Sequence, residues 1–213
     1  MFRWLERWFE NEPIGPIKTA LYICLFTVIN CVWVFCTFSL LDYWGVMPSY
    51  TEQAVSIPIS DVPFLLITLF YSALIEELVF RFFPISVMSM DHKLARGFLI
   101  TIFIAVILVI SPILVLAQNL IILLAGPLLI LLLVLRDRLK VILAIVLMSS
   151  VLFAFVHGPE WWYLVFQGMG GLIFSICYLK CGGYNGFALK PLLASSVTHC
   201  LSNMILIMGS AFF

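Results

Sequence analysis

The chain alternates long apolar runs with short polar turns, and most of the runs have the length of a membrane-spanning helix. Crossing a bilayer takes about 20 consecutive, predominantly apolar residues. One Leu-, Ile- and Val-rich stretch is too long for a single crossing, and Gln118 and Asn119 mark the reversal within it. The pattern therefore predicts seven spans, at about 20–41, 63–88, 97–117, 119–135, 141–157, 163–180 and 191–213.

The N-terminal residues have a different pattern. Residues 2–11 place apolar side chains on one face of a helix and charged side chains on the other, which is typical of a helix lying in the membrane interface. Pro13 and Pro16 end this helix. A frayed terminus is the alternative, because so short a helix is marginal in isolation. The chain thus divides into an interfacial segment, 1–16, and a single transmembrane domain, 17–213.

Composition supports a membrane protein. The chain is 64% hydrophobic and 10% charged, whereas soluble domains are about 45–50% apolar and about 25% charged. We therefore expect an all-α, polytopic membrane helical bundle in the cell membrane. The formal net charge of zero leaves no footprint for nucleic acid.

The basic residues predict an orientation. Lys and Arg outside the spans fall at the N-terminus and after the second, fourth and sixth spans. These alternate loops lie on one side of the membrane, which the positive-inside rule identifies as the cytoplasm. The N-terminus is therefore predicted to be cytoplasmic and the C-terminus to be outside.

Small residues show two further patterns. Gly168, Gly170 and Gly171 in the sixth span allow another helix to approach closely. The six cysteines lie mostly within apolar runs without a zinc-like spacing, so we interpret them as small core residues. The sequence predicts neither a metal nor a cofactor.

The second span carries charges where hydrocarbon disfavours them. Glu76, Glu77 and Arg81 lie within six residues of one another, and intramembrane charges usually mark a pathway or a reaction site. Glu77 and Arg81 are four residues apart and can pair on one helix face. Glu76 lies about 100° round the helix and points elsewhere. The simplest alternatives are a structural ion pair and a proton or ion site at Glu76.

Two later spans each carry a histidine. His157 lies one turn after Phe153, and His199 lies one turn before Asn203 on the same helix face. Taken alone, His157 fits an interfacial histidine against which Phe153 packs. Taken alone, His199 and Asn203 fit a hydrogen-bonding pair between helices. Glu76 falls in the middle of its span, whereas His157 falls near the outer end of its own.

Together these groups supply what amide hydrolysis requires. If the helices converge, Glu76 can deprotonate a water molecule that His157 also holds. His199 and Asn203 can then donate hydrogen bonds to the tetrahedral oxygen. Burying four such polar groups without partners would cost several kcal/mol.

The motifs resemble those of the CPBP family, the CAAX-processing and bacteriocin-processing membrane proteins. The resemblance rests on three motifs in order, in the spans at about 63–88, 141–157 and 191–213: Glu76-Glu77-x-x-x-Arg81, Phe153-x-x-x-His157 and His199-x-x-x-Asn203. It implies an intramembrane glutamic protease without metal, in which Glu76 and His157 activate water. It further implies that His199 and Asn203 form the oxyanion hole, and that Glu77, Arg81 and Phe153 support the site.

The resulting hypothesis is an intramembrane endopeptidase acting on a membrane-associated protein or peptide. One alternative is a zinc-dependent membrane protease in which Glu76, His157 and His199 hold the metal. Another is a non-enzymatic membrane interaction or immunity protein with the same fold. Proton-coupled transport ranks last, because no inverted repeat is visible.

Overall fold

The apolar runs fold into helices. The computed structural model describes residues 3–10, 14–45, 62–86, 138–158, 161–185 and 189–210, and every regular element within these ranges is helical. Five stretches are long and apolar enough to cross a membrane: Pro16–Tyr43, Pro63–Ile85, Leu139–His157, Trp161–Lys180 and Leu189–Met208. The predicted all-α membrane fold is confirmed. The predicted spans at 97–117 and 119–135 lie outside the described residues, so the total of seven stays a prediction.

The described elements follow one another with short breaks. They are α1 (Arg3–Phe9), α2 (Pro16–Tyr43), α3 (Val62–Glu77), η3 (Leu78–Phe82), α4 (Phe83–Ser86), α7 (Arg138–His157), α8 (Trp161–Tyr163), η5 (Leu164–Gly168), α9 (Met169–Lys180), η6 (Gly183–Asn185) and α10 (Leu189–Ser210). Pro16 opens α2, where its missing N–H costs no hydrogen bond. The elements α3, η3 and α4 form one continuous helical rod, and so do α8, η5 and α9.

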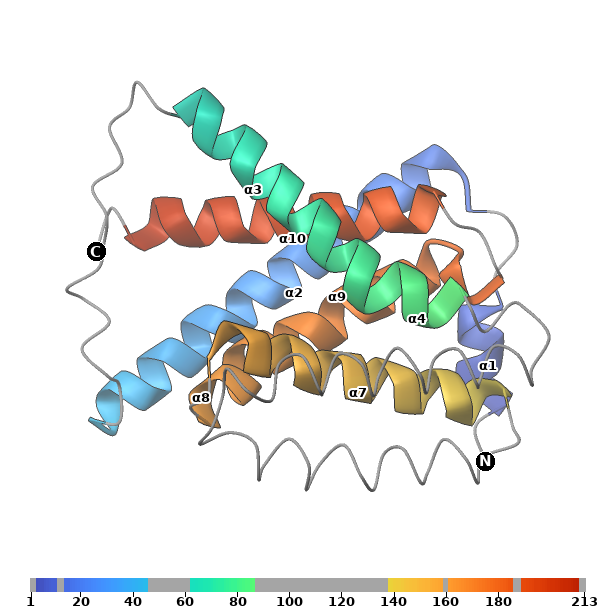
Figure 1. The fold of residues 1–213 in the computed structure, drawn as a ribbon, viewed down its shortest axis with the longest axis horizontal. Helices are drawn as coiled ribbons and strands as arrows, with labels where there is room; N and C mark the ends of the chain where they lie inside the picture. The colour runs from blue at the N-terminus through green and yellow to red at the C-terminus, as the bar shows by residue number, and fades with distance from the viewer. Residues whose placement is uncertain are drawn as a thin grey trace.

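Helix α10 lies at the centre of this arrangement. It packs against α2, α3 and α9, while α7 packs against α9 and η5. Helices α2, α7 and α10 run in one direction, and α3 and α9 run in the opposite direction (Figure 1). Three separate helical rods therefore bring the predicted site residues to the middle of the bundle: α3 with η3, then α7, then α10.

The element η3 is a π-helical segment inside the second span. The N–H of Phe83 bonds to the carbonyl of Leu78, five residues earlier, instead of to the residue four before it. Such single wide turns occur mostly within α-helices and frequently at functional sites. Arg81 lies in this turn and is buried.

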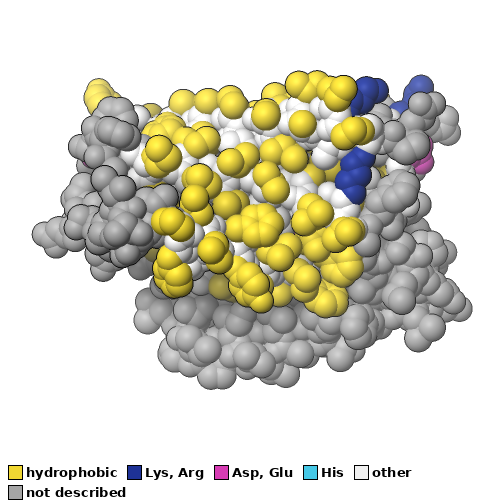
Figure 2. All heavy atoms as spheres, turned by 90° about the horizontal axis from the view of Figure 1, so that it is seen from above, with side chains coloured by type: hydrophobic (Ala, Val, Ile, Leu, Met, Phe, Trp, Pro, Cys, Tyr) yellow, Lys and Arg dark blue, Asp and Glu magenta, His cyan; other side chains and the backbone are white. Residues whose placement is uncertain are grey.

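Lysines gather at one end of the bundle. Lys18, Lys140 and Lys190 lie in the first turns of α2, α7 and α10, and Lys180 is the last residue of α9. Figure 2 shows one face, on which hydrophobic side chains cover the described surface and Lys and Arg side chains lie at one edge. This distribution is that of an apolar belt with a basic end.

The short helix α1 packs against the basic end of the bundle. Phe9 is 3% exposed, and its ring stacks on that of Tyr184 with 5.8 Å between the centroids. Lys180 Nζ donates to the Trp8 carbonyl and lies 4.2 Å from the centre of the Trp8 ring. The predicted N-terminal helix is present over Arg3–Phe9, and its place in the membrane interface stays a prediction.

The cysteines divide between the surface and the core. Cys24 and Cys36 are exposed on α2, so the interpretation of the cysteines as core residues is wrong for these two. They fall on the outer face of α2, beside exposed residues such as Leu25 and Phe35. The other four are buried, and all six are free thiols.

Candidate active site

A fully buried ion pair anchors the site. The Glu77 and Arg81 side chains are both 0% exposed, and Arg81 Nη1 lies 3.0 Å from Glu77 Oε1. This contact is the one that the four-residue spacing predicts. A lone charge at this depth would carry a large desolvation penalty, so each group needs the other.

The sixth span holds the other side of Arg81. Its Nη2 donates to the Gly171 carbonyl at 3.1 Å, and its Nε donates to Ser175 Oγ at 3.4 Å. The guanidinium carbon lies 4.5 Å from the centre of the Phe153 ring. A Cβ at Gly171 would lie 3.1 Å from both Arg81 Nη2 and Ser150 Cα, so this glycine permits the close approach. Arg81 thereby ties η3 to both α7 and α9.

Glu76 points away from this pair, as the helical geometry predicts. Ser72 Oγ, one turn earlier, donates to Glu76 Oε1 at 2.8 Å. The other oxygen, Oε2, lies 3.8 Å from His157 Nε2 and 3.7 Å from His199 Nε2. A carboxylate oxygen thus faces two imidazole nitrogens at distances slightly too long for direct hydrogen bonds.

His157 is oriented by its own helix. Its Nδ1 lies 2.7 Å from the Phe153 carbonyl, which can only accept, so Nδ1 carries the proton. In the neutral ring Nε2 then presents a lone pair toward Glu76. His157 is the last residue of α7, yet it reaches Glu76. The rod formed by α3, η3 and α4 crosses the neighbouring helices obliquely (Figure 1), which accounts for the different positions of the two residues within their spans.

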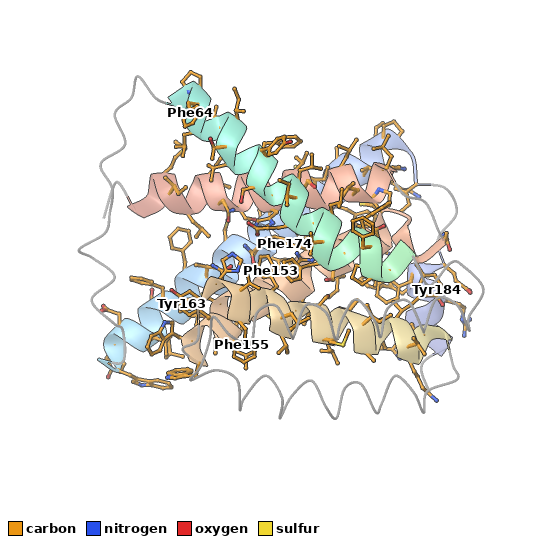
Figure 3. The ribbon with its side chains drawn as sticks, viewed as in Figure 1. Phe64, Phe153, Phe155, Tyr163, Phe174 and Tyr184 are labelled. Carbon is orange, nitrogen blue, oxygen red and sulfur yellow. The ribbon has the colours of Figure 1, made fainter. Side chains whose placement is uncertain are left out.

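His199 is held between the two glutamates. Its Nδ1 lies 3.1 Å from Glu77 Oε1, the same oxygen that Arg81 contacts. Since that carboxylate accepts, Nδ1 is the protonated nitrogen, and Nε2 can donate only when the ring is an imidazolium. The ring stacks on Phe174 at 4.4 Å between centroids. Figure 3 shows Phe174 beside Phe153 at the centre of the bundle.

Asn203 lies one turn beyond His199 and lines a cavity. The cavity has a volume of about 190 Å³ and includes Phe174 in its wall. Two further carboxamides, Asn30 from α2 and Gln167 from η5, also line it. Among the predicted site residues, Glu76, His157 and His199 meet around one oxygen, and Asn203 lies in the adjoining cavity.

Sequence reasoning missed three residues of this region. Ser72 was detectable, because it lies four residues before Glu76 on the same helix face. Phe174 and Asn30 had no local signal: an aromatic residue and a lone Asn in apolar runs are ordinary features of a span. Asn30 also belongs to the first span, which the motif resemblance did not cover.

Metal ligation was the main chemical alternative. The residues that would hold a zinc ion are Glu76, His157 and His199, the three that face each other around Glu76 Oε2. Within the described ranges, no group of three or more His, Cys, Asp or Glu side chains has the arrangement of a metal site. The water-based and metal-based readings of the same three residues therefore need a chemical test.

Comparison with known proteins gives one match. Residues 129–205 match the model of a family described as Type II CAAX prenyl endopeptidase Rce1-like. This confirms the resemblance to the CPBP family over a region that contains the His157 and His199 motifs. The Glu76 motif lies outside the matched residues, and the structure places it against the other two. Neither the curated proteins nor the solved structures gave a match.

Proposed function

We propose that the protein is an intramembrane endopeptidase that uses water activated by Glu76 and His157. The observation that carries this proposal is the position of Glu76 Oε2, which lies 3.8 Å from His157 Nε2 and 3.7 Å from His199 Nε2. A water molecule at about 2.8 Å from each of two acceptors fits between Glu76 and His157 and donates a proton to both. The family match supports hydrolysis of a peptide bond.

The chemistry then follows from the hydrogen-bonding roles of the side chains. The water oxygen attacks the scissile carbonyl carbon while Glu76 takes one of its protons. The resulting oxyanion accepts hydrogen bonds from the Asn203 amide and from Nε2 of His199 in its imidazolium form. As the C–N bond breaks, Glu76 returns the proton to the leaving nitrogen, which leaves a carboxylic acid and an amine. Glu77 fixes the His199 ring, and Arg81 holds Glu77.

The proposal includes a topology of seven spans with a cytoplasmic N-terminus. Helices α2, α7 and α10 begin at the end of the bundle where α3 and α9 finish (Figure 1). The described lysines lie at that same end, as the positive-inside rule expects of a cytoplasmic side. Two crossings between α3 and α7 preserve these directions. Cysteine-labelling of each loop in intact cells tests the orientation.

Cleavage by the purified protein tests the activity. The protein is reconstituted in phospholipid vesicles and offered internally quenched peptides, one a farnesylated peptide with a CAAX end and one the same peptide without the prenyl group. Glu76→Gln and His157→Phe should each lower kcat by at least about 100-fold, as expected for loss of acid–base catalysis. Glu10→Gln removes an exposed carboxylate of the same type and is the control.

Three results would point elsewhere. Full cleavage by Glu76→Gln removes the proposed mechanism. Loss of cleavage with a chelator, and its return with zinc, supports the metal-dependent alternative. A protein that cleaves neither peptide, and whose cellular function survives Glu76→Gln, is the non-enzymatic interaction protein.

A further inference from the structure

The cavity beside Asn203 adjoins the proposed site through a single side chain. Phe174 stacks on the His199 ring with 4.4 Å between centroids and also lines the cavity. The remaining wall comes from α2, from the α8–η5 turn and from α10. Whatever occupies the cavity therefore lies next to the groups that would act on a peptide bond.

The size of the cavity limits its occupant. Its volume is about 190 Å³. In another protein, an engineered apolar cavity of about 150 Å³ binds one benzene molecule. The cavity therefore has room for one aromatic or branched aliphatic side chain, but not for a whole acyl or prenyl chain.

The polar groups of the cavity favour a peptide over a lipid. Asn30 is 4% exposed, and its Oδ1 has no hydrogen-bond partner within the described part of the chain. Leaving such a buried acceptor unpaired costs about 1–3 kcal/mol. A carboxamide both donates and accepts, so it matches the N–H and C=O of a peptide backbone. A hydrocarbon chain offers neither group.

We propose that this cavity is a substrate subsite that binds one apolar residue of an extended peptide. The side chain of that residue fills the space among Val34, Phe166 and Leu206, and its backbone amide bonds to Asn30. The subsite rests on the proposed endopeptidase function and adds a specificity determinant to it. The determinant comes from α2, outside both the three motifs and the matched region.

Binding to a protein that does not hydrolyse tests the subsite. Full-length Glu76→Gln protein in nanodiscs is titrated with a fluorescent apolar peptide in which one Phe is scanned against Ala, and binding is followed by anisotropy. At one position Phe should bind about tenfold more tightly than Ala, which corresponds to about 1.4 kcal/mol. Leu206→Trp, which fills the cavity, should abolish this preference. Ile205→Trp, the exposed neighbour on α10, should preserve it.

The backbone contact needs its own measurement. Asn30→Leu should weaken binding of both the Phe and the Ala peptide by about threefold to tenfold, the value of one hydrogen bond. Replacing the peptide amide at that position by an ester should weaken binding to the parent protein but not to Asn30→Leu. If Leu206→Trp fails to fold, Val34→Phe fills the same cavity from α2.

Several outcomes would overturn the subsite. These are an equal effect of Leu206→Trp and Ile205→Trp, an equal ester penalty in the presence and absence of Asn30, or competition by farnesol that Leu206→Trp abolishes. The last would assign the cavity to a lipid chain. A Phe preference with no cleavage by the parent protein would uphold the subsite and count against the endopeptidase. Cleavage without a Phe preference would overturn the subsite alone.

Discussion

Replacing Arg81 by Met should strand a buried negative charge. Arg81 and Glu77 have 0% exposed side chains, and the pair is closed at 3.0 Å. In Arg81→Met, Glu77 keeps only the contact from His199 Nδ1 at 3.1 Å. Removing one partner of a buried pair costs about 3–5 kcal/mol. The contacts of Arg81 with Gly171, Ser175 and the Phe153 ring are lost as well, so we expect the upper half of this range.

A second substitution separates charge from packing. Adding Glu77→Gln to Arg81→Met removes the stranded charge, while the Gln oxygen still accepts from His199. The double variant should therefore recover stability and lie within about 2 kcal/mol of the parent, since a buried ion pair contributes little net stability over neutral groups. In a double-mutant cycle, this recovery appears as a coupling energy between the two sites.

Equilibrium unfolding in detergent micelles measures both effects. A loss of about 4 kcal/mol shifts the unfolding equilibrium constant by about a thousandfold, because about 1.4 kcal/mol corresponds to a factor of ten. The reasoning fails if Arg81→Met costs less than about 1 kcal/mol, or if the double variant is less stable than the single one.

Three further substitutions test separate contacts. Ser72→Ala removes the hydrogen bond to Glu76 Oε1 and should lower kcat about threefold to tenfold with KM unchanged; an unaltered kcat would contradict a positioning role. Gly171→Ala places a Cβ 3.1 Å from atoms of η3 and α7 and should cost about 1–3 kcal/mol in thermal unfolding, whereas Gly168→Ala, whose nearest neighbour is at 3.5 Å, should be tolerated. Phe9→Ala removes a ring that is 3% exposed and should make α1 accessible to protease while the rest of the chain stays folded; unchanged cleavage within α1 would argue against its docking.

Local spacing predicted what belongs to one helix. The apolar runs gave the spans, and the four-residue spacings gave the Glu77–Arg81 contact and the separate direction of Glu76. These relations depend only on helical geometry, which every span shares. The bundle itself was predictable because a chain this apolar has to satisfy its backbone internally.

Relations between helices were not predictable in the same way. The position of His157 at the end of α7 argued against a meeting with Glu76, yet the two lie 3.8 Å apart. Crossing angles decide this, and they depend on packing that one sequence does not reveal. The role of Asn30 was hidden for the same reason, because nothing in its own span indicates which neighbouring helix it faces.

The π-helical turn at η3 has a consequence for how this chain tolerates insertions and deletions. A wide turn accommodates one residue more than an α-helical turn of the same rise. Deleting a single residue from Leu78–Phe82 would let regular winding resume and rotate everything after it by about 100°. Ile85, now 3% exposed, would turn out toward lipid, and the guanidinium would lose its carboxylate. A one-residue deletion here should therefore be more damaging than any single side-chain replacement in the same turn.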